Sequence, residues 1–167
     1  MVSGVDHTDE LRRAEAAVLA VADPELPFLS IADLGILRGV ALRDSKVEVT
    51  ITPTYTGCPA MTVIAIEVEA ALAAAGITDA RVRSVLTPAW TTEWLTEAGR
   101  AKLAAAGIVP PDRATSRRAL FGVETSLACP LCGSPETERI SHFGSTACKA
   151  LHRCLACREP FEAFKCH

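Results

Sequence analysis

Four cysteines near the C-terminus are spaced so that they could hold one metal ion. They form two Cys-x-x-Cys pairs, Cys129 with Cys132 and Cys154 with Cys157, and residues 133–153 separate the pairs. A zinc ribbon uses two such pairs, on two hairpin tips, to build a tetrahedral four-sulfur site. So short a tail is near the size limit for an independent hydrophobic core, and a metal would also stabilise it. The spacing therefore predicts a zinc site, and the alternative is two redox dithiols or buried free cysteines.

Further metal-ligating residue types crowd the same tail. Cys148 and Cys166 are candidates for additional ligands, and three histidines accompany them: His142, His152 and His167. Imidazole and thiolate both bind zinc, so other combinations of these side chains could make the site. A second metal would need at least three more ligands, which Cys148, Cys166 and one histidine could supply. Cys166 and His167 could instead be a frayed end of the chain.

Cys58, outside this tail, is the other candidate for chemistry. Gly57 allows a sharp turn and Pro59 suits the first position of a helix, which would place Cys58 at the helix N-cap. There the helix dipole and the free N–H groups favour a thiolate, which is a better nucleophile and metal ligand than a thiol. The alternative is a buried cysteine that only fills space.

Two carboxylates, Asp23 and Asp33, occupy the loop that follows the first predicted helix. They could converge with Cys58 on one functional patch. Turn chemistry is the alternative, because Asp-Pro bends the chain and Asp33 precedes the turn at Gly35. Tyr55, the only tyrosine of the chain, could cover the thiol or simply pack.

Hydrophobic periodicity predicts the elements that must position these residues. Apolar residues at helical or alternating spacing predict three helices, at 8–22, 59–75 and 91–107, and three strands, at 36–43, 46–52 and 81–87. Asp44-Ser45 would be the tight turn between the first two strands. The third helix would start at a capping Thr91 and bury one face, formed by Trp94, Ala98, Ala101 and Ala105. The order α-β-β-α-β-α is that of a small α+β domain.

The chain is predicted to have two domains. Residues 8–107 would form the α+β domain and residues 127–167 the zinc-ribbon β module. Between them, residues 108–126 contain Pro110-Pro111 and several charged residues, which is typical of a linker.

Composition excludes several classes of protein. Of the 167 residues, 49% are hydrophobic and 22% are charged, and the net charge is −3, so the strong positive field that nucleic acids select is absent. We expect no membrane span and no secretion signal, and seven cysteines then indicate the reducing cytoplasm. Motifs for binding phosphate or an organic cofactor are also missing.

Three motifs in the first domain carry a resemblance to a known family. Asp23-Pro24-Glu25, Ser30-Ile31-x-Asp33-Leu34-Gly35 and Thr54-x-Thr56-Gly57-Cys58-Pro59 resemble the metal–sulfur cluster biosynthesis domain, an iron–sulfur assembly family. The C-terminal run 143–167 is similar to the end of PaaD-type proteins (also called PaaJ). These are the D subunits of bacterial phenylacetyl-CoA ring-epoxidase systems, and they join such a domain to a zinc ribbon. The resemblance covers roughly residues 10–167.

The resemblance implies an accessory or maturation protein for phenylacetate degradation. Its role would be to assemble an iron–sulfur cluster or deliver one to the flavin/iron–sulfur reductase subunit, and it would not be the catalytic subunit. The alternative is a non-catalytic or electron-transfer subunit, or an adaptor, of the epoxidase complex itself. Cys58, with Asp23 and Glu25 beside it, matches the loop positions of the family, and the four paired cysteines match its zinc ribbon. Cys148 also matches the tail of the PaaD-type proteins.

The number of thiols in the first domain bears on whether a cluster would need a partner chain. A cluster with two irons usually takes four protein ligands, and Cys58 supplies one. We therefore expect a homodimer, or ligands from another component of the epoxidase, if Cys58 binds a transient cluster.

Overall fold

The computed structural model describes residues 7–111 and 127–165, in two compact units that divide between Trp90 and Thr91. Cys166, His167 and residues 112–126 of the predicted linker lie outside the described residues. No helix in the described part of the chain is both long enough and apolar enough to span a membrane.

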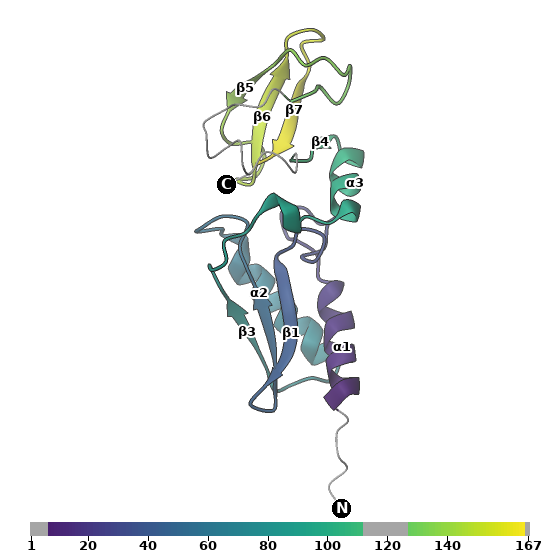
Figure 1. Ribbon diagram of the computed structural model, residues 1–167, viewed down its shortest axis with the longest axis vertical. Coiled ribbons are helices and arrows are strands. Elements are labelled where there is room, and N and C mark those ends of the chain that lie inside the picture. Colours follow the sequence, from purple (N-terminus) through teal and green to yellow (C-terminus); the bar gives the residue numbers. More distant parts are fainter. Residues whose placement is uncertain (1–6, 112–126, 166–167) are drawn as a thin grey trace, which may run out of the picture. The chain divides into compact units, whose positions relative to one another are not determined.

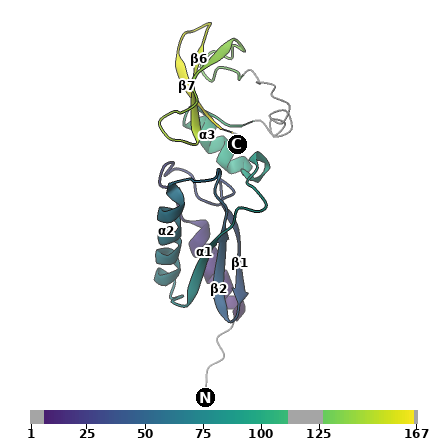
Figure 2. The ribbon, with the colours of Figure 1, turned by 90° about the vertical axis from the view of Figure 1, so that its left-hand side faces the viewer.

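The first unit is a three-stranded sheet with two helices on one of its faces (Figures 1 and 2). The sheet has the order β1-β2-β3, with β1 antiparallel and β3 parallel to β2. Its elements in chain order are α1 (His7–Leu19), β1 (Leu37–Arg43), β2 (Lys46–Ile51), α2 (Ala60–Ala74) and β3 (Ala80–Ser84). The predicted order of elements is confirmed up to this point.

The core of this unit follows the predicted periodicities. On α2, Ile64, Val68 and Leu72 recur at every fourth residue and are fully buried. On β2, Val47 and Ile51 lie on the face that packs against the helices. The turn between β1 and β2 is also confirmed: Asp44 and Ser45 have φ of 51° and 62°, as a tight two-residue hairpin requires.

The second unit is a four-stranded sheet of order β4-β7-β6-β5, preceded by short helical segments. Its small core is formed by Phe161 and two cysteines, Cys129 and Cys154, with Val109 and Leu127 packed against them. The elements are η1 (Thr92–Trp94), α3 (Glu97–Ala105), β4 (Ile108–Val109), β5 (Thr137–Ser141), β6 (Lys149–Cys154) and β7 (Pro160–Phe164).

The third helix differs from the prediction. It is broken into η1 and α3 at Leu95, which is extended (φ −66°, ψ 121°) and turns its side chain into the core at 2% exposure. The N-cap of α3 is therefore Thr96, whose hydroxyl accepts a hydrogen bond from the Gly99 N–H at 2.9 Å. Leu103 is the large residue that α3 buries, and the predicted alanine face is wrong because these residues are exposed: Ala98, Ala101 and Ala105.

The division of the chain also differs from the predicted boundary at residue 107. The two units divide after Trp90, and α3 belongs to the second unit. Residues 108 and 109, which lie in the predicted linker, form β4, and Ile108 is buried. They pair in parallel with β7, and local sequence patterns carry no signal for a partner so distant along the chain.

Candidate metal centre and thiol site

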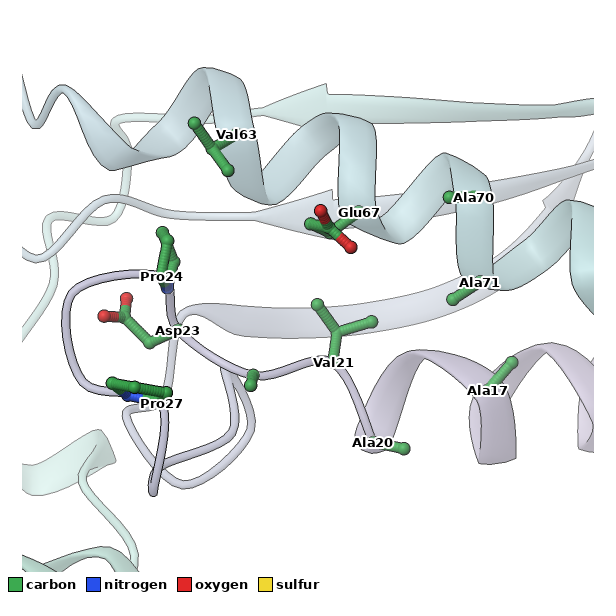
Figure 3. A pocket seen from close by; sticks show the side chains of 11 residues that line it. Ala17, Ala20, Val21, Asp23, Pro24, Pro27, Val63, Glu67, Ala70 and Ala71 are labelled. Atoms are coloured by element: carbon green, nitrogen blue, oxygen red, sulfur yellow. The ribbon is translucent and has the colours of Figure 1, made fainter.

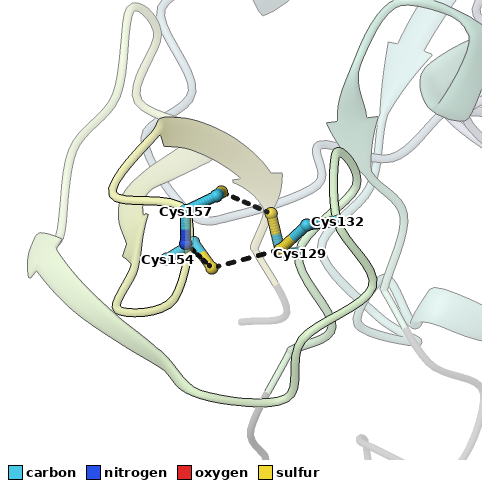
Figure 4. Close-up of side chains that lie close together, drawn as sticks. All are labelled: Cys129, Cys132, Cys154 and Cys157. Atoms are coloured by element: carbon cyan, nitrogen blue, oxygen red, sulfur yellow. Dashed lines mark hydrogen bonds between the residues drawn. The ribbon is translucent and has the colours of Figure 1, made fainter.

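The four paired cysteines come together at one point of the second unit (Figure 4). All four Sγ atoms lie within 4.8 Å of one another. Cys129 Sγ is 3.7 Å from Cys157 Sγ, and Cys132 Sγ is 3.5 Å from Cys154 Sγ. In a tetrahedral zinc site with Zn–S bonds of ~2.3 Å, neighbouring sulfurs are ~3.8 Å apart. The thiols therefore fit the four-sulfur zinc site that their spacing predicts.

Two similar turns position the four thiols. After the first pair, Gly133 has φ of 74° and its N–H donates to the Cys129 carbonyl at 2.9 Å. After the second pair, Arg158 adopts nearly the same φ of 66°. A residue in the left-handed region lets the chain turn back after each pair. The two halves of the site are thus built by the same local device, although only the first uses glycine.

Backbone donors favour the thiolate form at one of these cysteines. The Cys157 N–H donates to Cys154 Sγ at 3.4 Å. This bond is the main cause that lowers the pKa of Cys154 to about 6, whereas at Cys157 a backbone hydrogen bond from Glu159 is outweighed by burial and by the hydrogen bonds shared with the other three thiols, which raise its pKa to about 12. A thiolate is the form that binds a metal ion, so Cys154 loses its proton most readily and a bound metal ion would have to displace the proton of Cys157.

The other candidate ligands of the tail lie outside this group. Cys148 is buried, and its sulfur lies 3.1 Å from the Thr146 hydroxyl. His152 stacks on Phe161, with ring centroids 5.6 Å apart. Among the described residues only the four paired cysteines form a metal-ligand cluster. A ligand role for Cys148 or Cys166 stays a prediction.

Cys58 lies just before α2, one residue further from the helix than predicted. The N-cap is Pro59, which offers no side-chain cap. The Cys58 N–H donates to the Tyr55 carbonyl at 3.3 Å, so the thiol belongs to a closed turn and is half-buried.

The predicted thiolate at Cys58 is not what this environment favours. Burial raises the pKa of the Cys58 thiol, and it outweighs hydrogen bonds from the Ala60 backbone and the Tyr55 side chain, which lower it. The negative charges of Glu25 and Asp23 raise the pKa further. The pKa of Cys58 is therefore shifted in the opposite direction to the one that the helix dipole predicts, because burial and the two carboxylates act against the thiolate.

Asp23 and Glu25 are the two carboxylates that the family resemblance associates with Cys58, whereas the residues alone suggested Asp23 and Asp33. The Asp23 side chain also shapes its own loop, since its Oδ1 accepts hydrogen bonds from the Glu25 N–H at 2.9 Å and the Leu26 N–H at 2.8 Å. Burial is the largest influence on Asp23 and raises its pKa, against the effect of these two bonds. Asp23 thus combines the turn role with an electrostatic effect on Cys58, and the two interpretations are compatible.

Asp33 and Tyr55 have different positions relative to the thiol. Asp33 and Ser30 bond each other reciprocally, because each side chain accepts from the other's N–H at 3.0 Å. These two bonds close the loop at Asp33, so the turn interpretation fits it. Tyr55 contacts the thiol through its side chain, which favours the covering role.

A pocket that the sequence did not indicate opens beside this loop (Figure 3). It has a volume of about 440 Å³ and lies between the end of α1, the Asp23 loop and α2. Small apolar side chains line most of it, together with the carboxyl groups of Asp23 and Glu67: Ala17, Ala20, Val21, Ala22, Pro24, Pro27, Val63, Ala70 and Ala71. The alanines of α1 and α2 were visible in the sequence, but only the packing of the two helices makes them a hollow.

Comparison with known proteins finds two family models that match separate parts of the chain. Residues 12–86 match the family model described as "Iron-sulfur cluster assembly protein", and residues 113–165 match the "PaaD zinc beta ribbon domain". The putative D subunit of the 1,2-phenylacetyl-CoA epoxidase of Escherichia coli (strain K12) is 43% identical over 151 residues. The match covers 90% of each chain.

Comparison with solved structures finds similarity to part of this chain. The crystal structure of a domain of unknown function, DUF59, from Bacillus anthracis is 26% identical with a TM-score of 0.52, over 57% of this chain and 92% of that chain. A solution structure from Mycobacterium tuberculosis, of Rv1466, a protein associated with Fe-S complex assembly and repair, is 32% identical. It covers 65% of this chain and 96% of that chain, with a TM-score of 0.34. The predicted α+β fold with a C-terminal zinc ribbon is confirmed.

Proposed function

This chain belongs to the family of phenylacetyl-CoA epoxidase D subunits, and on that premise we propose that it matures the epoxidase system. It assembles an iron–sulfur cluster, or delivers one, to the flavin/iron–sulfur reductase component in the cytoplasm. The observation that supports the proposal is that the charges of Asp23 and Glu25 act on the thiol of Cys58, which lies just before α2.

The chemistry of this site suits a cargo that must be released. A thiol with a raised pKa is protonated at neutral pH, so a cluster iron has to displace that proton before it binds. The competition with the proton weakens binding. Carboxylates beside the sulfur are hard oxygen ligands that can accept the proton or hold iron briefly. A single thiol is also too few for a resident cluster, so further ligands come from a second copy or from the recipient.

The second unit has a structural role in this proposal. Its four thiols would supply all four protein ligands of a zinc ion, which is the ligand set of a structural site. A zinc ion would then cross-link the two Cys-x-x-Cys turns and stabilise a unit whose apolar core is small.

An adaptor without cluster chemistry is the competing function. The protonated state of Cys58 favours it, because a protein that only docks needs no reactive thiol. The two functions differ in whether Cys58 is required.

The test measures transfer to the purified reductase from which the cluster has been removed. The protein is first loaded with an iron–sulfur cluster, and the reductase is then followed by its visible absorbance and its electron-transfer activity. Cys58→Ser is nearly isosteric and should cost on the order of 1 kcal/mol of stability, yet it should abolish transfer. Zinc content and thermal unfolding of the variant provide the control for folding.

Growth on phenylacetate gives the second readout. Cells that depend on this protein should fail to grow with Cys58→Ser at normal protein level. Full growth, together with unchanged cluster loading of the reductase, would leave the adaptor as the better account.

A further inference from the structure

The connection between β5 and β6 is held by a buried ion pair and the hydrogen bonds around it. Lys149 is buried, and its Nζ lies 2.7 Å from Glu162 Oε2 and 2.5 Å from the Ser145 hydroxyl. The Ser145 N–H donates to the other oxygen of Glu162, and the Gly144 N–H donates to the Lys149 carbonyl at 2.8 Å. These bonds tie Gly144 and Ser145, in the middle of the loop, to Lys149 at the start of β6 and to Glu162 on β7.

Gly144 shows how closely the loop is fitted to this network. A Cβ atom at Gly144 would stand 2.5 Å from Glu162 Oε1 and 3.2 Å from the Lys149 Cβ. Any side chain there would push the carboxylate away from its two partners. Glycine at this position therefore leaves room for the Glu162 carboxylate to bond both Ser145 and Lys149.

This loop exposes the aromatic ring of Phe143 to solvent, with a positive charge beside the ring. Phe143 is 65% exposed, and Lys165 Nζ lies 4.4 Å from the centre of its ring. Arg139 is close enough that its charge lowers the pKa of Lys165, after the larger effect of burial. A preorganised aromatic side chain is a typical anchor of a protein interface, since little conformational entropy is lost when it docks.

The pocket of the first unit has the complementary chemistry. Its lining is apolar, with alanines at its sides and a half-open rim at Val63, which is 44% exposed. Glu67 places a carboxylate in it, and among the described residues none forms an ion pair with Glu67 (Figure 3). Acidic residues outnumber basic ones in the described part of the first unit, and basic residues slightly outnumber acidic ones in that of the second. An aromatic ring would suit the apolar lining of this pocket, and a neighbouring cation would suit the negative charge of Glu67.

We propose that the Phe143 loop of one copy docks into the Glu67 pocket of a second copy of this chain. Phe143 enters among the alanines, and Lys165 pairs with Glu67. The interaction is independent of cluster transfer. It would, however, place part of the second copy against the Asp23 loop, whose charge acts on Cys58.

Sedimentation velocity of the full-length zinc-loaded chain over a range of concentrations tests this proposal. Wild type should self-associate, and Phe143→Ala should raise the dissociation constant at least ~10-fold, as for an aromatic anchor. Glu67→Lys and Lys165→Glu should each weaken association. Leu131→Ala and Glu69→Lys are matched controls, because Leu131 is 67% exposed on a zinc knuckle and Glu69 is an exposed α2 carboxylate outside the pocket.

Mixing the two charge variants is the decisive step. A Glu67→Lys chain and a Lys165→Glu chain each repel themselves, but both contacts between them are attractive, so the mixture should associate again. A wild type that stays monomeric at every concentration overturns the proposal. So does a Phe143→Ala variant that associates as tightly as the two controls. If Phe143→Ala instead weakens binding to the purified reductase and leaves self-association unchanged, the second copy is not the occupant.

Discussion

Ile108 lies opposite Glu162 in a parallel ladder that joins β4 to β7 across the zinc ribbon. The pairing makes a stretch that resembles a linker part of the metal-binding unit. Val109, the next residue, packs on the core of Phe161, Cys129 and Cys154. The folded zinc-ribbon unit therefore begins well before its first cysteine, Cys129.

Fragments of the chain should fold according to these limits. A fragment 91–167 should bind zinc and unfold cooperatively, whereas 127–167 lacks β4 and should be less stable, because Phe161 and the β7 edge lose their cover. Thermal melts with zinc measure the difference. Equal melting temperatures for the two fragments would contradict a structural role for β4.

The first unit should fold alone as residues 1–90. It holds its own core, and its last residue, Trp90, is buried and donates its indole N–H to the Leu34 carbonyl at 2.8 Å. Circular dichroism should show a cooperative transition for this fragment. A disordered spectrum at neutral pH would mean that the second unit supplies part of its core.

One zinc ion per chain should depend on the four clustered thiols. Cys132→Ser should lose the metal and melt the second unit, since structural zinc contributes apparent free energies of ~10–16 kcal/mol in zinc-finger peptides. Native mass spectrometry measures the stoichiometry. Cys148→Ser serves as the control and should keep its zinc. Retained zinc in the Cys132→Ser protein, with an unchanged ribbon, would refute the assignment.

Cys58 should react slowly at neutral pH. Its raised pKa leaves less thiolate than in a peptide, where the value is ~8.5, so iodoacetamide should modify it more slowly at pH 7. Asp23→Asn and Glu25→Gln remove negative charge, which lowers the pKa and should speed the reaction. Asp33→Asn is the matched control and should have little effect. Peptide mapping at several pH values gives the rate at Cys58. A rate above that of a peptide thiol would show that the helix dipole, and not burial, dominates the pKa of Cys58.

Acid should weaken the loop network of the second unit. Burial alone would raise the pKa of Glu162, but hydrogen bonds from Lys149 and Ser145 outweigh it and hold the pKa below its ordinary value. The stability from this pair is therefore present above the unfolded pKa of ~4.3 and is lost as the pH falls through the lower folded value. Glu162→Gln should cost about 2 kcal/mol near pH 7, because it leaves the buried Lys149 without its counter-charge. Denaturant titrations of wild type and variant should converge at low pH. A constant difference down to pH 2 would contradict the pairing.

The sequence by itself determined the features that depend on local spacing. Two Cys-x-x-Cys pairs, the alternation of Val47, Val49 and Ile51, and the hairpin turn at Asp44-Ser45 each specify their structure through neighbouring residues. The motifs around Asp23 and Cys58 were equally visible, and they indicated which residues meet at the first site. Local patterns suffice here because a turn, a cap or a metal knuckle is closed by residues a few positions apart.

Tertiary structure decided what depends on distant partners. Burial and the charges of Asp23 and Glu25 reversed the expected shift at Cys58, because a pKa reflects every group packed around the thiol. The predicted third helix is interrupted at Leu95, which is extended and buried, although the surrounding sequence has helical spacing. The parallel pairing of β4 with β7 and the pocket beside Glu67 likewise exist only once separate elements pack. Long-range packing outweighs local preference at these positions, since the free energy of burial exceeds the small differences in intrinsic propensity.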